Sequence, residues 1–217
     1  IPTFVALSRF VESQGLSAFS QNYPYWYLGS TPFKYLVGHL VPILFVGLHK
    51  TLAFVSLFDI SIYMIAFSFL LSSIGWGILA DRLSVSRKIG IFVVIILVIL
   101  PWRYLVSIGI DETSFILARN FLPFVLLFIL KFLLTRKTRD KYIAVFVILL
   151  LLLVNTSILP ILFVSIFSLV LAVSFREGKI RNISDQSKTS LILLMTSLVV
   201  VTVWYTPSYW FTILFNP

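Results

Sequence analysis

The chain of 217 residues has no cysteine, and this absence excludes several kinds of site at once. Disulfide frameworks, thiolate metal centres and cysteine nucleophiles all need a residue that is not there. Histidine is nearly as scarce, and the two that occur, His39 and His49, are not at metal-ligand spacing. The sequence also has no phosphate-binding Gly-Lys-Ser loop, no dinucleotide-binding glycine fingerprint and no nucleophile elbow. The familiar signatures of soluble enzymes are therefore missing.

Charged residues are also rare, at 12% of the chain against 59% hydrophobic residues. No soluble globular domain of this size has such a composition. Several apolar runs of about 17–25 residues are each long enough to cross a bilayer core of about 30 Å. The sequence therefore predicts an all-α polytopic transmembrane helical bundle in an integral membrane protein.

Six spans are predicted, at residues 58–80, 89–104, 115–134, 142–154, 157–175 and 189–205. Twelve of the 17 Lys and Arg residues lie in or beside the connections 81–88, 136–141 and 176–188. The positive-inside rule makes that side cytoplasmic, so both ends of the chain fall on the outer side. Because the basic residues are spread over short loops, membrane topology explains them better than nucleic-acid binding. We expect the plasma membrane of a prokaryote or the endoplasmic reticulum membrane of a eukaryote.

Residues 1–56 are predicted to form an extracytoplasmic loop with interfacial helices, followed by the six-span region 57–217. The apolar stretch 35–50 contains His39 and Pro42 and is too short for a comfortable crossing, so we expect an interfacial or re-entrant helix. A helix nearer the start would place Leu7, Phe10 and Val11 on one face. The chain opens with Ile1 and has no signal-peptide pattern, so we expect a piece of a longer protein.

Residues 9–42 contain an ordered series of motifs: a helix with Arg and Glu, a glycine, an aromatic element, a Gly-Pro-Phe turn and an interfacial helix. The residues in that order are Arg9, Glu12, Gly15, Tyr25, Trp26, Gly29, Pro32, Phe33 and Tyr35. This segment resembles the first extracytoplasmic loop of the polyprenyl-phosphate-dependent membrane glycosyltransferases of the GT-C superfamily. Within it, the segment is most similar to the membrane proteins called 6-pyruvoyl-tetrahydropterin synthase-related. The rest of the chain agrees with them in hydropathy and topology.

The resemblance implies transfer of a sugar from a polyprenyl- or dolichyl-phosphate donor to an acceptor at the outer face. The bilayer and the lipid-linked donor would then be the partners. Such chemistry needs a carboxylate to deprotonate the acceptor or to hold a divalent cation, Mg or Mn, and a cation to neutralise the leaving phosphate. The main catalytic Asp of the superfamily, which usually follows the first span, is expected upstream of Ile1.

Asp111 and Glu112 are the candidate catalytic residues and tentative metal ligands, because they are adjacent carboxylates in an outer loop. The alternative is an ordinary helix cap with acids at the positive end of the dipole. Arg119 falls one turn inside the next predicted span, where a cation is costly and usually faces protein or a water-filled cavity. It would bind the lipid phosphate, or else snorkel to the outer headgroups.

Four further residues are candidates for substrate binding. Arg9 and Glu12 would line the acceptor site, although an exposed i, i+3 ion pair is the simpler interpretation. Tyr25 and Trp26 would stack on a sugar face, and anchoring at the membrane surface is their alternative role. His39 would assist phosphate binding or proton transfer, or else make a polar contact between interfacial helices.

Two other classes of function stay open. One is a transporter or flippase-like carrier, with Arg119 and Asp59 along a pathway. That class usually has broken helices at the midplane, whereas most spans here are uniformly aliphatic. Asp59 is alternatively a helix cap or a partner of Lys50. The other class is a non-catalytic membrane domain that retains the GT-C fold.

Overall fold

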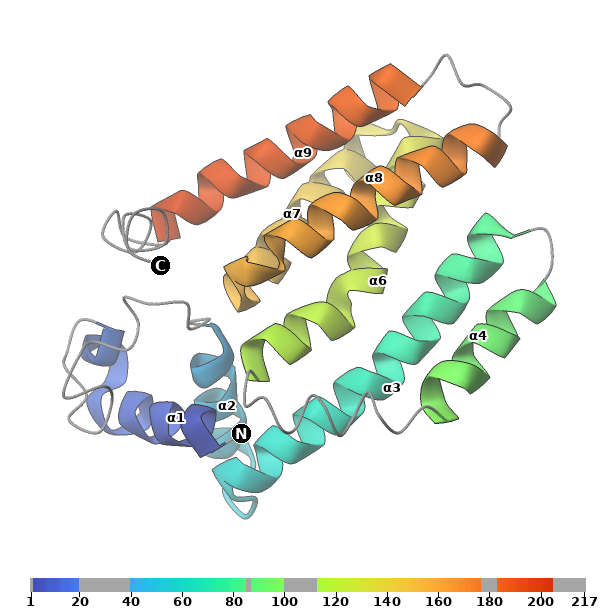
Figure 1. Ribbon diagram of the computed structural model, residues 1–217. Helices are drawn as coiled ribbons and strands as arrows, with labels where there is room; N and C mark the ends of the chain where they lie inside the picture. The colour runs from blue at the N-terminus through green and yellow to red at the C-terminus, as the bar shows by residue number, and fades with distance from the viewer. Residues whose placement is uncertain (1, 20–39, 85–86, 100–112, 177–182, 205–217) are drawn as a thin grey trace.

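The computed structural model describes residues 2–19, 40–84, 87–99, 113–176 and 183–204. Every regular element within these ranges is a helix, as predicted (Figure 1). The α-helices are α1 (Pro2–Gln14), α2 (Leu40–Thr51), α3 (Leu57–Leu83), α4 (Arg87–Ile99), α6 (Thr113–Thr135), α7 (Thr138–Val154), α8 (Leu159–Arg176) and α9 (Ile183–Trp204). Two short 3-10 helices, η1 (Gly15–Phe19) and η3 (Thr156–Ile158), follow α1 and α7.

Three helical stretches in the described part of the chain are long and apolar enough to cross a membrane. They are α3 with 27 residues, α6 with 23 residues, and Thr156–Ser174, which joins η3 to most of α8. Each of the six predicted spans coincides with a helix, but the described part of α4 has 13 residues and α7 has 17. The structure thus supports an all-helical membrane protein with three candidate spans, and the six-span GT-C-like bundle stays a prediction.

The amino-terminal helices α1 and α2 pack against each other and against α3. Leu7, Phe10 and Val11 are buried together on one face of α1, as the sequence predicts. α1 ends at Gly15, whose φ of 62° is the left-handed conformation that favours glycine at a helix end. α2 is a helix of 12 residues, about 18 Å long, which is too short to cross a bilayer. The interfacial position of both helices stays a prediction.

Asp59 takes part in the cap at the start of α3. The Ser56 hydroxyl accepts a hydrogen bond from the Asp59 backbone amide at 3.1 Å and donates one to the Asp59 carboxylate at 2.6 Å. A capping hydroxyl of this kind satisfies one of the amides that the first turn leaves without a partner. The N-cap is therefore Ser56, and Asp59 is its hydrogen-bond partner in the first turn of α3.

One face of α3 consists mainly of small residues and packs against α6. Ser61, Ile65, Ser68, Ser72 and Gly75 follow each other at intervals of three and four residues, and all are buried. This spacing keeps them on one side of a helix, and small side chains let two helix backbones approach closely. A Cβ atom on Gly75 would lie 3.0 Å from the Pro123 side chain of α6. The interface between α3 and α6 is therefore tight.

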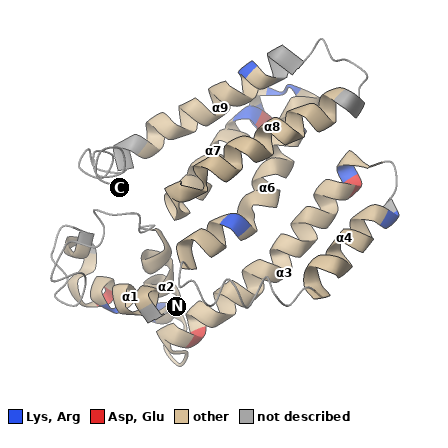
Figure 2. Cartoon of the chain, viewed as in Figure 1, with Lys and Arg blue, Asp and Glu red and all other residues tan. Residues whose placement is uncertain are grey.

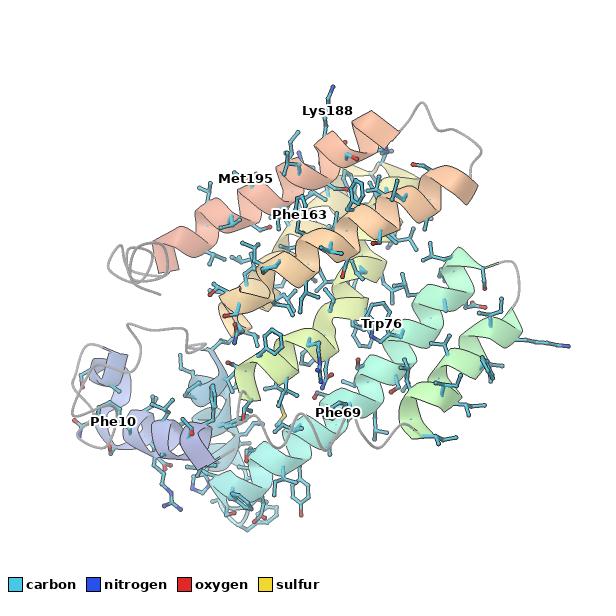
Figure 3. The ribbon with its side chains drawn as sticks, viewed as in Figure 1. Phe10, Phe69, Trp76, Phe163, Lys188 and Met195 are labelled. Atoms are coloured by element: carbon cyan, nitrogen blue, oxygen red, sulfur yellow. The ribbon has the colours of Figure 1, made fainter. Side chains whose placement is uncertain are left out.

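α6 is the centre of the larger hydrophobic core, which also draws on α7, α8 and α9. Trp76 projects from α3 into this core (Figure 3). α6 contains Pro123, which has no backbone N–H and clashes with the preceding turn, so a helix bends there. Figure 1 shows α6 bent along its length.

Basic residues gather at one end of the bundle (Figure 2). They lie at the start of α4, at the connection between α6 and α7, and near the start of α9, while the end of α3 carries one acid and one base. These are the connections that the sequence predicts to be cytoplasmic. The structure brings them to the same side of the molecule, which the positive-inside rule requires of such loops.

Candidate functional site

Buried polar side chains line the interface between α3 and α6. The Asn120 side-chain amide donates a hydrogen bond of 2.9 Å to the Ser68 hydroxyl, which in turn donates to the Ile65 carbonyl at 2.7 Å. Asn120 Oδ1 and Ser72 Oγ are also buried, and neither has a hydrogen-bond partner among the described residues. Interhelical hydrogen bonds of this kind join helices in lipid, where water is absent.

A second buried polar contact joins the start of α6 to the turn after α7. The Asn155 side-chain amide donates a hydrogen bond of 2.8 Å to the Ser114 hydroxyl, and both residues are buried. Asn155 Oδ1 accepts a bond of 2.7 Å from the Ser157 amide, which caps the start of η3. Thr113 Oγ1, one residue before Ser114, is buried with no hydrogen-bond partner among the described residues. We refer to Ser68, Ser72, Thr113, Ser114, Asn120 and Asn155 as the polar seam.

Arg119 lies beside the polar seam, in the second turn of α6. Its side chain is half-buried, although it belongs to a helix that is a candidate span. The structure thus places a cation next to buried polar side chains at this end of α6. An anionic group is the kind of ligand that a guanidinium group binds.

Arg9 and Glu12 are both in α1, where Arg9 is exposed and Glu12 is half-buried. Glu12 Oε1 lies 3.8 Å from His49 Nε2 of α2, a contact between the two helices. The other ring nitrogen of His49 is 3.0 Å from the Val55 carbonyl in the turn before α3. Glu12 therefore helps to hold α1 on α2, a role that the i, i+3 spacing with Arg9 did not indicate.

Asp111, Glu112, Tyr25, Trp26 and His39 lie outside the described residues. The prediction of a catalytic and metal-binding pair at Asp111 and Glu112, and of sugar and phosphate contacts at the other three, is therefore neither confirmed nor contradicted. Within the described ranges, the structure brings no three His, Asp or Glu side chains together as a metal site would need. The proposed Mg or Mn ion stays an expectation that depends on Asp111 and Glu112.

Sequence reasoning missed the polar seam. Most spans were described as uniformly aliphatic, and α3 is an exception, because Ser61, Ser68, Ser72 and Ser73 are all buried. The signal was present in the sequence, because Ser61, Ser68 and Ser72 recur at the spacing of one helix face. Asn120 was a second signal, since an amide in an apolar run needs a partner on a neighbouring helix.

A separate charged cluster joins α6 to α7 at the basic end. Lys131 Nζ lies 3.2 Å from Asp140 Oδ1, and the Thr135 hydroxyl donates a 2.7 Å hydrogen bond to Asp140 Oδ2. The Thr135 hydrogen bond, followed by the Lys131 charge, lowers the pKa of Asp140. Lys131 and Thr135 of α6 therefore hold the first turn of α7 through Asp140.

Comparisons with protein-family models, curated proteins and solved structures return no match to this chain.

Proposed function

We propose that this chain is part of a membrane glycosyltransferase that takes a sugar from a polyprenyl- or dolichyl-phosphate donor. One observation supports the proposal most directly: Arg119 is half-buried in the second turn of a candidate span, beside the polar seam. An arginine inside a membrane helix is costly and usually marks a functional position. The planar guanidinium group is well suited to a phosphate, which it contacts through two parallel hydrogen bonds.

The position of Arg119 also fits the side on which the donor would react. Arg119 is near the start of α6, and the basic connection to α7 is at the other end of the same helix, about 24 Å away for 16 residues at 1.5 Å each. If the basic end faces the cytoplasm, Arg119 lies toward the outer surface. The segment 9–42, which resembles the first outer loop of the GT-C enzymes, is predicted for the same surface.

In the proposed reaction, the acceptor hydroxyl attacks the anomeric carbon of the donor, and the bond from that carbon to the phosphate oxygen breaks. The proton of the acceptor passes to a carboxylate, and the lipid phosphate leaves with the electron pair. Arg119 would stabilise the negative charge that develops on the phosphate. Asp111, Glu112 and an acid expected upstream of Ile1 are the candidate bases.

The test is sugar transfer by the full chain in proteoliposomes containing a radiolabelled donor, with polyprenyl-phosphate mannose and polyprenyl-phosphate glucose tried in turn. We expect Arg119→Gln to lower transfer by about tenfold or more, because it removes a charged donor to the phosphate. Arg119→Lys should retain part of the activity. Arg139→Gln, an exposed cation near the start of α7, is the matched control and should act like the wild type.

A second arm changes Asp111 and Glu112 together to Asn and Gln. Unchanged transfer in this double variant would remove both residues from the catalytic site while leaving the role of Arg119 intact. Donor binding without transfer in the wild-type protein, measured with the same lipids, would instead favour the non-catalytic membrane domain.

A further inference from the structure

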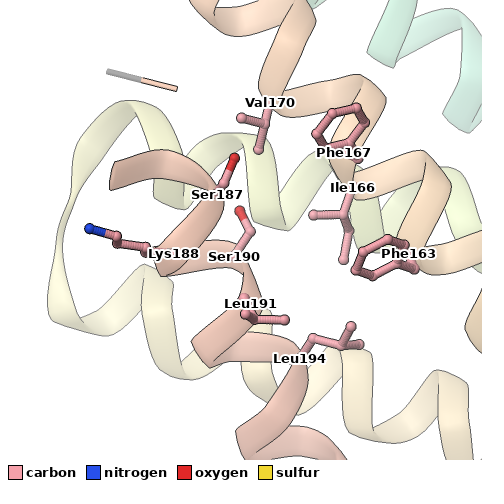
Figure 4. A pocket seen from close by; sticks show the side chains of 9 residues that line it. All are labelled: Phe163, Ile166, Phe167, Val170, Ser187, Lys188, Ser190, Leu191 and Leu194. Atoms are coloured by element: carbon pink, nitrogen blue, oxygen red, sulfur yellow. The ribbon is translucent and has the colours of Figure 1, made fainter. Parts of the chain in front are cut away.

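A groove of about 380 Å³ lies between α8 and α9, and none of the residues of the polar seam lines it (Figure 4). Its walls are mainly apolar, and they consist of Phe163, Ile166, Phe167 and Val170 from α8 and Leu191 and Leu194 from α9. Phe163, Phe167 and Leu191 are each about half exposed, so the groove is open along the outer surface of the bundle. Since α8 belongs to a candidate span, this surface would face lipid.

One end of the groove is polar. Ser187, Lys188 and Ser190 line it, and all three come from the beginning of α9. The Ser190 side chain is 3% exposed, and its hydroxyl oxygen has no hydrogen-bond partner among the described residues. In Figure 4 the Ser187 and Ser190 oxygens both point into the polar end, whereas the Lys188 side chain extends outward. A buried hydroxyl without a partner is costly unless a ligand or water satisfies it.

A second cation lies close to this polar end. Arg136, just after α6, donates a 3.3 Å hydrogen bond to the Thr189 hydroxyl, and Thr189 is between Lys188 and Ser190 in the sequence. The polar end therefore has two exposed cations beside it, together with one buried hydroxyl. It also belongs to the side of the molecule where basic residues gather, which is the predicted cytoplasmic surface.

We propose that the groove between α8 and α9 binds one anionic phospholipid from the cytoplasmic leaflet. One acyl chain lies along the phenylalanines and leucines, and the phosphate lies at the polar end, near Lys188 and Arg136, within reach of the Ser190 hydroxyl. The groove follows α9 from Ser187 to Leu194, about 10 Å of helix, which is most of the depth of one leaflet core. Basic pockets between membrane helices on the cytoplasmic side have this chemistry. The proposal is independent of glycosyl transfer, because Arg119 is near the far end of α6.

The test is native mass spectrometry of the full chain released from nanodiscs that contain equal amounts of phosphatidylglycerol and phosphatidylcholine. We expect the wild type to retain phosphatidylglycerol in preference. Lys188→Gln should weaken that retention about fivefold, the effect of one cation near a phosphate at about 1 kcal/mol. Lys137→Gln removes an equal charge from the exposed start of α7 and should leave retention unchanged.

The position of the lipid is tested with phosphatidylglycerol that carries a photoactivatable group in one acyl chain. We expect label on peptides of α8 and α9, and loss of that label in Leu191→Trp, where a larger side chain fills the groove at a half-exposed position. Equal retention of the two lipids, equal effects of Lys188→Gln and Lys137→Gln, or label spread evenly over α3 and α4 would overturn the proposal. So would cross-linking of another part of this chain, or of a second copy, into the groove.

Discussion

Asp140 shows how one carboxylate can join two helices. Each of its oxygens has a partner on α6: the Lys131 ammonium at 3.2 Å and the Thr135 hydroxyl at 2.7 Å. The carboxylate is also in the first turn of α7, where a negative charge is favourable at the positive end of the helix dipole. These interactions favour the ionised form, so the pKa of Asp140 is below its usual value of 3.8.

We therefore predict that part of the stability of the α6–α7 pair depends on pH. A carboxyl group whose pKa is lower in the folded state contributes stability above its unfolded pKa, and this stability is lost as the pH falls through the folded pKa. The thermal midpoint of the wild type in detergent should therefore decrease from pH 6 to pH 3 by more than that of Asp140→Asn. Circular dichroism at a helical wavelength measures both midpoints.

Thr135→Val separates the causes of this pH dependence. It keeps the shape of the side chain but removes the hydroxyl donor, which is the largest cause of the low pKa. Its pH dependence should be intermediate between those of the wild type and Asp140→Asn. Identical pH profiles for all three proteins would contradict the assignment of the stability to Asp140.

At the level of single residues, the sequence predicted local roles better than distant partners. The cap at the start of α3 joins Ser56 and Asp59, which are three residues apart, so a local pattern can specify such a contact. The Asn120 hydrogen bond to Ser68 joins residues that are 52 apart, and Asn155 to Ser114 joins residues 41 apart. Such pairs depend on which helices are neighbours, and no local pattern specifies this.

At the level of helices, α3 and α4 approach each other through a pair of glycines. A Cβ atom on Gly90 would lie 2.7 Å from the Gly77 carbonyl oxygen and 2.9 Å from Asp81 Cβ. A Cβ atom on Gly77 would collide with the Val94 side chain and lie 2.9 Å from the Gly90 carbonyl oxygen. Because backbone atoms cannot rotate away as a side chain can, the two helices would have to separate.

Gly77→Ala and Gly90→Ala should each destabilise the protein by about 1–3 kcal/mol, the usual cost of forcing extra atoms into a packed interface. The matched control is Gly47→Ala in α2, because a Cβ atom there has no neighbour within 4 Å. Alanine is the better helix former, so this control should be neutral or stabilising by up to about 1 kcal/mol. Unfolding in detergent with increasing sodium dodecyl sulfate measures the differences. If Gly47→Ala lost as much stability as Gly77→Ala and Gly90→Ala, the cause would be a requirement for flexible helices and not the close packing of α3 on α4.

Apolar runs predicted the existence of every helix from α3 to α9 that the structure describes, because lipid requires each segment to satisfy its own backbone hydrogen bonds. Helix ends were less accurate. α7 begins at Thr138 and α9 at Ile183, each several residues before the predicted span, since helices continue past the apolar run into polar residues. The catalytic part of the candidate site could not be compared, because Asp111 and Glu112 lie outside the described residues.

At the level of the whole molecule, the sidedness of the basic residues leads to a test of topology. The chain has no cysteine, so a thiol reagent can label only the cysteine that is introduced, and the labelling shows on which side of the membrane that position lies. Ala53→Cys lies in the exposed turn before α3, and Thr138→Cys lies at the exposed start of α7. Between them are α3, α4 and α6, which the sequence predicts to be spans, and three crossings would place the two positions on opposite sides of the membrane.

A membrane-impermeant maleimide should therefore label Ala53→Cys in intact cells, and should label Thr138→Cys after permeabilisation. The positive-inside rule sets this direction, because the basic connection between α6 and α7 stays in the cytoplasm. Labelling of both positions from outside would mean that one of the three helices does not cross. The helix that fails to cross would then be α4, because its described part has 13 residues.

The three candidate spans differ in length, and this has a consequence for the surrounding bilayer. α3 has 27 residues, about 40 Å, whereas the Thr156–Ser174 stretch has 19 residues, about 28 Å. A hydrocarbon core of about 30 Å matches the shorter stretch, so α3 must tilt or reach into the headgroups. In a thicker membrane α3 would be less tilted, whereas the shorter stretch that contains α8 would no longer span the hydrocarbon core. Bilayer thickness would therefore change the angle between α3 and α8, and with it the spacing along the α3–α6 interface where Asn120 bonds to Ser68.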